Sequence, residues 1–321
     1  MERNVEIGKS GIRVPQIGFG ATALASMPDT YGYAVGEERA LATIRAILDL
    51  PDGFIDTSRI YGLGRSEELI GKVVRDLGGW PAGRILSTKL DRDVATGRFD
   101  AAQARRSIEE SLAALGVDRV QVLHLHDPEH ASDLGEISRP GGALSEMMRM
   151  KEEGLAATVG LAAGRIDIMM PMLRDWDFDV LITHNRYTLV NRNAEPMIEL
   201  ARSRGVSVFN AAPYASGALA KGASNHRRYV YQEASDSMLE PIRRVEAVCA
   251  RHGIPPGAAA LQFSLRDPRI ASTICGVSRP ERVAETLTWA AWPISEDAWR
   301  ELLALSASHD DPESTRDYKP G

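Results

Sequence analysis

Apolar residues along the chain follow two alternating patterns, short continuous runs and longer segments in which they recur at three- or four-residue spacing. Runs of about four to eight residues that stop at Gly, Asp or Pro predict buried strands, and the wider spacing predicts amphipathic helices. The first such pair is a strand at residues 17–20 and a helix with apolar residues at 41, 44, 47 and 48. Ahead of them, alternating segments flank Gly8-Lys9-Ser10-Gly11, which predicts a β-hairpin.

The same alternation continues through the rest of the chain. Further strands are expected at residues 54–56, 85–89, 120–125, 157–161, 180–183, 206–210 and 270–274. Helices are expected at residues 69–77, 100–116, 142–153, 167–174, 196–204, 238–251, 257–265, 280–289 and 295–306. Asp100 followed by Gln103 is typical of a helix N-terminus. We expect an irregular loop from residue 211 to about 231 and a loose polar tail after residue 309.

Eight strand–helix units follow one another without an interdomain linker. Strict alternation implies parallel strands joined by right-handed crossovers. Eight such units favour a closed (β/α)8 barrel, or TIM barrel, that takes up residues 1–321 as one domain of ordinary size for this fold. A doubly wound open sheet is the alternative. It usually carries G-x-G-x-x-G after its first strand, whereas this chain has Gly18-Phe19-Gly20-Ala21-Thr22 there, so the barrel is preferred.

Composition narrows the range of partners and compartments. The formal net charge of -6 argues against a nucleic-acid-binding protein, which needs a basic face. Cys249 and Cys275 are too few for a disulfide framework, so a reducing cytoplasm is expected. Residues 1–4 have no apolar signal segment, and no run approaches the ~18 apolar residues of a membrane span. We therefore expect a cytoplasmic protein without membrane or nucleic-acid partners, and the oligomeric state stays open.

Four chemically active side chains fall where a barrel usually carries its function, at the C-terminal strand ends. Asp56, Lys89 and His126 end the second, third and fourth strands. Neighbouring strands lie about 4.8 Å apart, so these three side chains share one small mouth. Tyr61, five residues after Asp56, can reach back over it. His124 faces the same side two residues deeper, and we expect it to be packed inside the barrel.

These residue types are suited to proton transfer. A free tyrosine has a pKa near ~10, and a neighbouring ammonium lowers it by favouring the phenolate. In this arrangement Asp56 holds Lys89, Lys89 tunes Tyr61, and His126 orients a substrate oxygen. Such a phenol exchanges a proton with a carbonyl or hydroxyl, while a cofactor must supply the hydride. Taken singly, these residues have simpler explanations. Asp56 would be a cap, Tyr61 a packed loop residue, Lys89 a solvated strand end and His126 a core histidine. Their joint position at neighbouring strand ends favours catalysis.

Several longer motifs accompany these residues. They are the segments 8–20, 54–62, 66–67, 87–89, 125–128 and 276–283. With these motifs the chain resembles the aldo-keto reductases over nearly its whole length. The resemblance implies a catalytic tetrad of Asp56, Tyr61, Lys89 and His126, a hairpin that closes the barrel bottom, and a nicotinamide cofactor across the top. Segments 184–190 and 260–265 are similar to the branch with aldose 1-dehydrogenases, L-galactose dehydrogenase and pyridoxal 4-dehydrogenase.

The resemblance also implies where the cofactor binds. Its pyrophosphate would lie on the loops after the seventh and eighth strands, Ser216-Gly217 and Gly276-Val277-Ser278. Backbone N–H groups in such turns, with a helix starting near Pro280, suit a phosphate. The other expected cofactor contacts are Gly20, Ala21, Thr22, Asp56, His184, Ala211, Arg282 and Glu285.

The choice between NAD and NADP depends on charge, because phosphate recognition is dominated by cations. Family members that prefer NADP place a lysine where this chain has Gly276. Arg282 is retained, with Arg279 nearby, although both would also suit a solvated helix start. Glu285 would repel a phosphate or accept hydrogen bonds from ribose or adenine. This pattern favours NAD and leaves NADP open.

Two departures from the family pattern concern the nicotinamide. Ala162-Ala163 replaces a common Ser-Asn pair and cannot donate side-chain hydrogen bonds, so His184 is expected to compensate. Ala211 falls where a stacking aromatic is usual, and Tyr214 either takes that role or packs.

The sequence therefore predicts an NAD(P)-dependent oxidoreductase that interconverts an alcohol or hemiacetal with a carbonyl or lactone. An aldose oxidised at C1 or a pyridoxal-type aldehyde is the expected substrate, with residues 128–142 and 211–231 shaping its pocket. The alternative is a non-catalytic, cofactor-sensing regulatory subunit on the same fold. A metal-dependent hydrolase or isomerase fits less well, because His124, His126 and Asp127 have no further ligand cluster at other strand ends, and no metal is expected.

Overall fold

The computed structural model describes residues 4–230 and 232–314. Residue 231, at the end of the expected loop, and residues 315–321 of the expected tail lie outside this description. The chain starts with the predicted hairpin, in which β1 (Val5–Glu6) pairs antiparallel with β2 (Arg13–Val14). Within the described part, no helix combines the length and apolar content needed to cross a bilayer.

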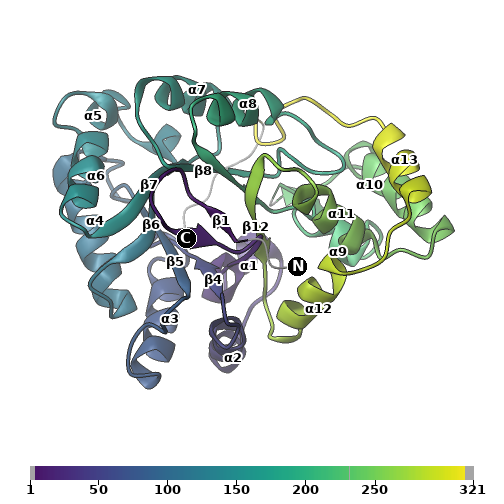
Figure 1. The fold of residues 1–321 in the computed structure, drawn as a ribbon, viewed down its shortest axis with the longest axis horizontal. Helices are drawn as coiled ribbons and strands as arrows, with labels where there is room; N and C mark the ends of the chain where they lie inside the picture. The colour runs from purple at the N-terminus through teal and green to yellow at the C-terminus, as the bar shows by residue number, and fades with distance from the viewer. Residues whose placement is uncertain (1–3, 231, 315–321) are drawn as a thin grey trace.

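Eight parallel strands close into a barrel in the order β12-β3-β4-β5-β6-β7-β8-β9 (Figure 1), which confirms the predicted fold class. The strands are β3 (Ile17–Gly20), β4 (Phe54–Asp56), β5 (Ile85–Leu90), β6 (Val120–His126), β7 (Ala156–Ala162), β8 (Val180–His184), β9 (Ser207–Ala211) and β12 (Ile270–Gly276). Asp56 lies beside Ser87 and Lys89 beside His124, so each candidate residue is offset by two positions from the candidate residue on the next strand, and all three point to the same face of the sheet. This register brings the candidate residues to one rim.

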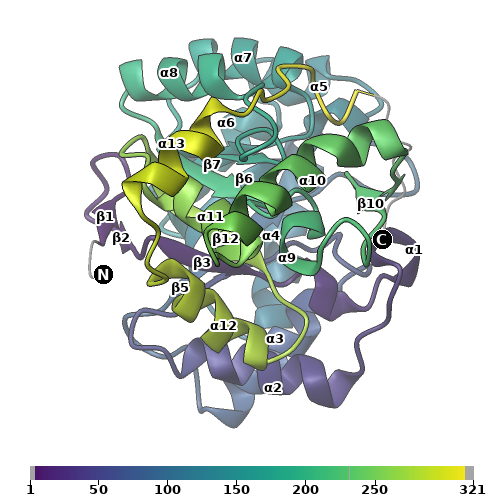
Figure 2. The same ribbon diagram turned by 90° about the vertical axis from the view of Figure 1, so that its right-hand side faces the viewer.

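Helices surround the barrel and separate its strands from solvent (Figures 1 and 2). They are α2 (Glu37–Leu48), α3 (Arg65–Asp76), α4 (Ala101–Leu115), α6 (Ala143–Glu152), α7 (Ile166–Asp175), α8 (Glu195–Ser203), α10 (Asp236–Arg251), α11 (Pro256–Leu265), α12 (Glu281–Ala290) and α13 (Glu296–Ala304). Shorter turns are η1 (Thr22–Ala25), α1 (Pro28–Tyr31), η2 (Pro128–His130), α5 (Gly135–Ser138) and α9 (Ala218–Lys221). At the start of α4, the Asp100 side chain accepts a hydrogen bond from the Gln103 backbone N–H, as predicted.

The hairpin seals one end of the barrel. Ile7 and Val14 are fully buried and belong to the interior cluster that contains Phe54 and Phe209. The two phenylalanine rings lie 5.4 Å apart in an edge-on arrangement. Phe54 begins its strand, so this packing fills the N-terminal end of the barrel and leaves the C-terminal end for a site.

Two expectations about irregular segments are wrong. The loop expected at 211–231 contains α9 and the first strand of a short hairpin, β10 (Arg228–Tyr229) paired with β11 (Gln232–Glu233). Leu219 and Val230 are almost fully buried there, and their burial orders the segment. The tail is also ordered as far as residue 314. Fully buried Arg186 needs a counter-charge, and Asp311 supplies it at 2.8 Å.

Candidate active site

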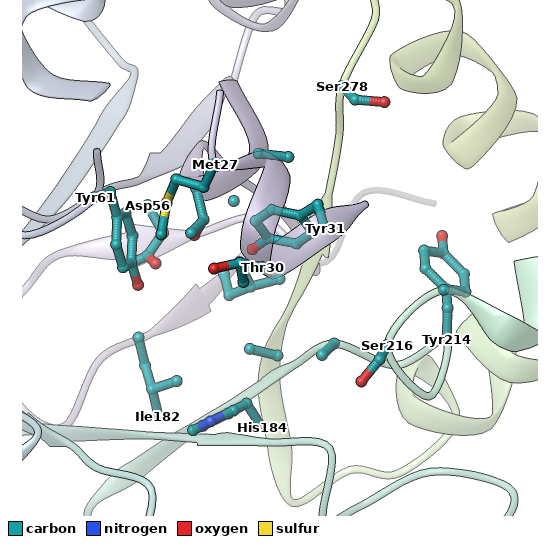
Figure 3. Close-up of a pocket in the computed structure, with 18 of the residues that line it drawn as sticks. Met27, Thr30, Tyr31, Asp56, Tyr61, Ile182, His184, Tyr214, Ser216 and Ser278 are labelled. Atoms are coloured by element: carbon teal, nitrogen blue, oxygen red, sulfur yellow. The ribbon is translucent and has the colours of Figure 1, made fainter. Parts of the chain in front are cut away.

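A pocket opens where the parallel strands end (Figure 3). Its strand-end lining comprises Gly20, Asp56, Lys89, His126, Ala162, Ile182, His184, Ala211, Ile274 and Gly276. Met27, Thr30 and Tyr31, in and next to α1, form a wall that the sequence did not predict. Arg228 ties this wall to the segment after β9 by donating hydrogen bonds to the carbonyls of Asp29 and Thr30 at 3.1 and 3.0 Å.

The segment after β9 lines the pocket as expected, but the segment after β6 does not. None of residues 128–142, all of which the structure describes, is among the lining residues. Ile137 is fully buried in the outer core between the barrel and its helices, which draws this segment away from the mouth. Only Asp127, just before it, reaches the pocket.

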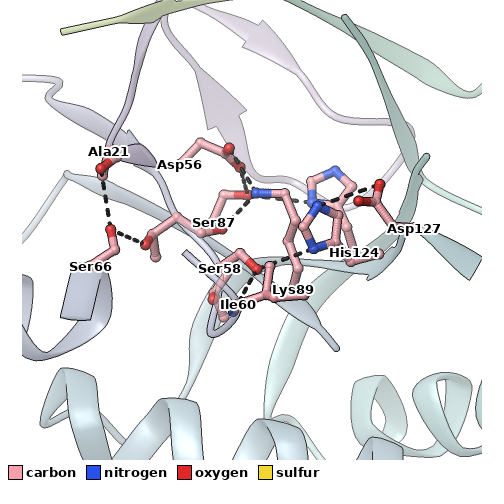
Figure 4. Close-up of polar contacts among 12 residues, drawn as sticks. Ala21, Asp56, Ser58, Ile60, Ser66, Ser87, Lys89, His124 and Asp127 are labelled. Carbon is pink, nitrogen blue, oxygen red and sulfur yellow. Dashed lines mark hydrogen bonds and ion pairs between the residues drawn. The ribbon is translucent and has the colours of Figure 1, made fainter. Parts of the chain in front are cut away.

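Asp56 and Lys89 form a buried ion pair at the pocket floor (Figure 4), with Lys89 Nζ 2.8 Å from Asp56 Oδ2. The ammonium also donates to the Thr57 carbonyl at 2.6 Å, and the Ser87 hydroxyl donates to Asp56 Oδ1 at 2.8 Å. Lys89 is only 2% exposed. A buried charge without such partners would be strongly destabilising, so the lysine is fixed in position and charged.

Tyr61 lies over this pair. Lys89 Nζ is 4.8 Å from the centre of the Tyr61 ring, so the two side chains share one rim of the barrel. The loop that carries Tyr61 turns at Gly62, where φ is +60° and an added Cβ would lie 2.7 Å from the Ala25 Cβ. A side chain at that position would push the loop away from η1. Glycine therefore permits the close approach that places Tyr61 over Lys89.

His126 meets Tyr61 edge-on, with 5.7 Å between ring centres. Its Nδ1 lies 2.6 Å from Asp91 Oδ1, and the Ser58 hydroxyl donates to Asp91 Oδ2 at 2.6 Å. Its Nε2 lies 3.7 Å from Asp127 Oδ1. Asp91 was missed at the sequence level. The available signal was an acid two residues after Lys89, in the loop that leaves the same strand end.

Burial and charge act in opposite directions on this histidine and its partner. Burial lowers the pKa of His126, but the carboxylates of Asp127 and Asp91 outweigh it, and the net pKa is above the ordinary value. Burial raises the pKa of Asp91, but the His126 charge and hydrogen bonds from His126 and Ser58 bring it below the ordinary value. Each partner thus stabilises the ionised form of the other.

His124 is fully buried, as expected for a packed barrel histidine. Its Nδ1 lies 3.4 Å from the Ser87 hydroxyl. Burial, and then the charge of Lys89, hold its pKa well below the ordinary value. It is therefore neutral, and it separates the charged rim from the apolar barrel interior.

The opposite side of the pocket carries residues from β9, β12 and the loops that follow them, including Ser216, Tyr214 and Ser278 in Figure 3. Of the expected cofactor residues, Gly20, Thr22, Asp56, His184, Ala211, Ser216, Gly217, Gly276, Ser278 and Arg282 line the pocket. Ala21, Val277 and Glu285 do not. Ala21 and Val277 are buried between strand ends, and Glu285 pairs with Arg282 at 2.7 Å instead of standing free to repel a phosphate.

Two cations that lie on this side of the pocket are Arg282, which was expected from the sequence, and Lys221, which was not. Lys221 from α9 lies with its Nζ 4.5 Å from the centre of the Tyr33 ring. Burial, and then the charges of Arg282 and Arg279, lower its pKa. The Arg282 guanidinium lies 5.2 Å from the Trp289 ring. Lysine and arginine side chains that converge although they repel one another suit an anionic group between them.

His184 at the end of β8 lines the pocket and is held from behind by the C-terminal segment. Its Nε2 lies 2.7 Å from Oε1 of Glu313, which is largely buried. Ala162 and Ala163 beside it offer no side-chain donors. Tyr214 packs at the wall, because its ring contacts Trp289 at 5.7 Å and its hydroxyl donates to the Cys275 sulfur at 3.5 Å. Burial raises the pKa of Tyr214 well above its ordinary value.

The pocket fits a nicotinamide dinucleotide by its donor set. Acid/base side chains occupy one side, while cations, glycines and serine hydroxyls occupy the other, as a reactive nicotinamide ring and a pyrophosphate require. In the described residues, no three His, Cys, Asp or Glu side chains are grouped so that they could hold a metal ion.

A closed (β/α)8 barrel with this tyrosine, lysine, aspartate and histidine around one mouth defines a barrel oxidoreductase. Residues 16–307 match the Aldo/keto reductase family, and the chain belongs to that family. It is accordingly an NAD(P)-dependent oxidoreductase with a small-molecule carbonyl compound as substrate.

Individual relatives agree with this assignment. The chain is 29% identical to a D-threo-aldose 1-dehydrogenase from a Pseudomonas species, over 91% of this chain and 94% of the relative. It is 30% identical to L-galactose dehydrogenase of Arabidopsis thaliana, over 88% and 86% of the two chains. A solved aldo-keto reductase from Bacillus halodurans has a TM-score of 0.75 at 20% identity, with 96% and 97% of the two chains covered, and shows the shared fold. The branch expected from the motifs is thus confirmed.

Proposed function

We propose that this protein oxidises an aldose at C1, taking a cyclic hemiacetal to a lactone, or converts a related aldehyde of the pyridoxal type. The observation that carries the proposal is the buried Asp56–Lys89 pair with Tyr61 over the ammonium and His126 beside the ring. The names of the two relatives, an aldose 1-dehydrogenase and a galactose dehydrogenase, support a sugar substrate.

In this proposal each side chain has a distinct role. Tyr61 exchanges the proton with the reacting oxygen, and the Lys89 ammonium favours its phenolate form electrostatically. Asp56 keeps Lys89 charged and in place through the 2.8 Å contact. His126 donates a hydrogen bond to the same substrate oxygen. The bound nicotinamide supplies or accepts the hydride.

We propose that the cofactor lies along the pocket with its ring beside Tyr61 and its phosphates toward Lys221 and Arg282. Backbone N–H groups at Ser216-Gly217 and Gly276-Val277-Ser278 would hold the pyrophosphate. Gly20-Ala21-Thr22 and Ala211 would border the cofactor, and His184 would hold the nicotinamide amide. NAD is the preferred form, because the Arg282–Glu285 ion pair leaves less charge for a 2′-phosphate; NADP is accepted with lower affinity.

The test is turnover of a panel of aldoses and pyridoxal with NAD or NADP, followed by the absorbance of the reduced nicotinamide. Tyr61→Phe should lower kcat by about 10²–10⁴-fold, because it removes the acid/base group, and should leave cofactor affinity nearly unchanged. Phe keeps the ring over Lys89, so the variant serves as its own packing control. Cofactor binding without turnover of any aldose or carbonyl compound by the wild type would contradict the proposal and favour the regulatory subunit.

A further inference from the structure

Asp91 is held in place by three hydrogen bonds to its side chain. Its Oδ2 accepts from the Ser58 hydroxyl at 2.6 Å and from the Ile60 backbone N–H at 3.0 Å, and its Oδ1 faces His126 Nδ1 at 2.6 Å. The Asp91 side chain is 5% exposed and that of His126 is 8% exposed. Burial raises the pKa of Asp91, but the charge of His126 and the hydrogen bonds from His126, Ser58 and Ile60 bring it below its ordinary value, so Asp91 is an ionised carboxylate, which can only accept hydrogen bonds.

The proton between the two groups therefore lies on His126 Nδ1. The Ser58 hydroxyl is also 3.1 Å from Nδ1, but its single proton is already given to Asp91, so it cannot serve that nitrogen as a donor. A neutral imidazole carries one N–H. With that proton fixed on Nδ1, the Nε2 on the side of Asp127 has an N–H only when the ring holds two protons.

We propose that Asp91 makes His126 act as a charged imidazolium rather than as a neutral hydrogen-bond donor, so that its contact with the substrate oxygen exists only while the ring is doubly protonated. The inference rests on the proposed function for the identity of that oxygen. Asp91 is a positioning residue, since it does not line the active-site pocket and acts through the histidine. Tyr61 still carries the transferred proton in either direction, and His126 keeps both of its own.

The charged groups around the ring support this form. Asp91 lies behind it and Asp127 beside its Nε2, and these two carboxylates oppose the positive charge of Lys89. Burial, and then Asp127, raise the pKa of Glu129 in η2 to about 8, so this neighbour adds little charge at neutral pH. His124 is neutral, and the Tyr61 ring meets the His126 ring in a T-shaped arrangement.

The charge on His126 affects both the strength and the pH dependence of its hydrogen bond to the substrate oxygen. A charge-assisted hydrogen bond is roughly twice as strong as a neutral one, so an imidazolium stabilises negative charge on the reacting oxygen more than an imidazole does. Burial lowers the pKa of His126, but the carboxylates of Asp127 and Asp91 raise it above its ordinary value, which extends the charged form of the ring to higher pH. As the pH rises through that pKa, the ring loses the Nε2 proton while Asp91 retains the one on Nδ1. The donor to substrate is then lost completely.

The experiment combines Asp91→Asn with a titration of the His126 ring nitrogens by ¹⁵N NMR and with pH profiles of kcat/KM. Both nitrogens of the wild type should be protonated near neutral pH. In Asp91→Asn the His126 pKa should fall, kcat should drop by about tenfold, and the alkaline decline due to His126 should flatten, because a neutral ring can then place its proton on Nε2. Nucleotide affinity, measured with NADH, should stay unchanged.

Asp93→Asn is the matched control, because it removes the same charge from a partly exposed residue of the same loop. Its profile and its His126 titration should match the wild type. Ser58→Ala removes one bond to Asp91 but keeps the carboxylate, so it should show a smaller shift in the same direction. If Asp91→Asn does not fold, the wild-type titration and Ser58→Ala decide the question.

Two results would overturn the inference. The first is a neutral wild-type His126 ring with its proton on Nε2 near neutral pH. The second is a His126 titration that is identical in Asp91→Asn and in the wild type. Failure of the proposed function looks different. In that case no sugar or aldehyde is turned over, while the ring nitrogens still report the Asp91-dependent double protonation.

Discussion

The two sides of the pocket are built in different ways. The side of β4, β5 and β6 consists of buried side chains on strand ends, each fixed by hydrogen bonds to its neighbours, as Lys89 is by Asp56 and Thr57. The side of β9 and β12 consists of loops, glycines and the cations Lys221 and Arg282. Proton chemistry needs precisely placed, desolvated groups, whereas an extended anionic cofactor is held by many weaker contacts spread over loops.

Removal of the central cation, Lys89, should have the strongest consequences. Lys89→Met leaves Asp56 buried without its partner, so the free energy of unfolding should fall by about 3–5 kcal/mol, and turnover should be lost. Denaturant unfolding and the turnover assay measure the two effects. In the double variant Asp56→Asn/Lys89→Met, the isolated charge is gone, and much of the stability should return without activity. A double variant no more stable than Lys89→Met would show that lost packing, and not the unpaired charge, causes the effect.

An intermediate effect is expected on the cationic side. Lys221→Ala should weaken NAD(H) binding by about five- to tenfold, consistent with one charge-assisted hydrogen bond, while kcat changes little. Titration of NADH fluorescence measures the affinity. Arg243 is a partly exposed arginine on α10, and Arg243→Ala is the control for loss of positive charge that should bind as the wild type does. Unchanged affinity in Lys221→Ala would place the phosphates elsewhere in the pocket.

The smallest effect should follow from the C-terminal segment. Glu313→Gln keeps the shape but removes the charge that faces His184 Nε2 at 2.7 Å. Because the histidine is then less firmly oriented, the KM for the nicotinamide cofactor should rise about two- to fivefold, and kcat should fall by no more. Steady-state kinetics measure both constants. The neighbouring exposed Asp310→Asn should have no effect, and an equal change in both variants would mean that the segment acts only through its own stability.

Sequence patterns predicted the first side of the pocket better than the second, for physical reasons. Asp56, Lys89 and His126 end apolar strand runs, and barrel topology brings consecutive strand ends together, so their proximity follows from periodicity alone. Lys221 was missed because it lies in a segment that reads as an irregular loop, yet forms α9 once Leu219 is buried. Tyr33 was missed because it meets Lys221 only across the pocket.

Contacts between distant parts of the chain were the hardest to predict. Asp91 follows Lys89 by two residues, but its role depends on a loop that turns its carboxylate back toward the next strand. The tail reads as polar and loose, because nothing local shows that buried Arg186 and half-buried His184 require acids from more than a hundred residues away. By contrast, the cap at Asp100 was predicted, because it involves only the next three residues.

The pairing of β12 with β3 joins the last strand of the barrel to the first. Ile17 lies beside Thr273 and Gly20 beside Gly276, so the seam that closes the sheet also sets two pocket-lining glycines side by side. A chain that ended before residue 270 would leave β3 and β9 as unpaired edges, with free backbone N–H and C=O groups that invite aggregation. Such a fragment would therefore be a poorly soluble, open sheet and not a smaller working barrel.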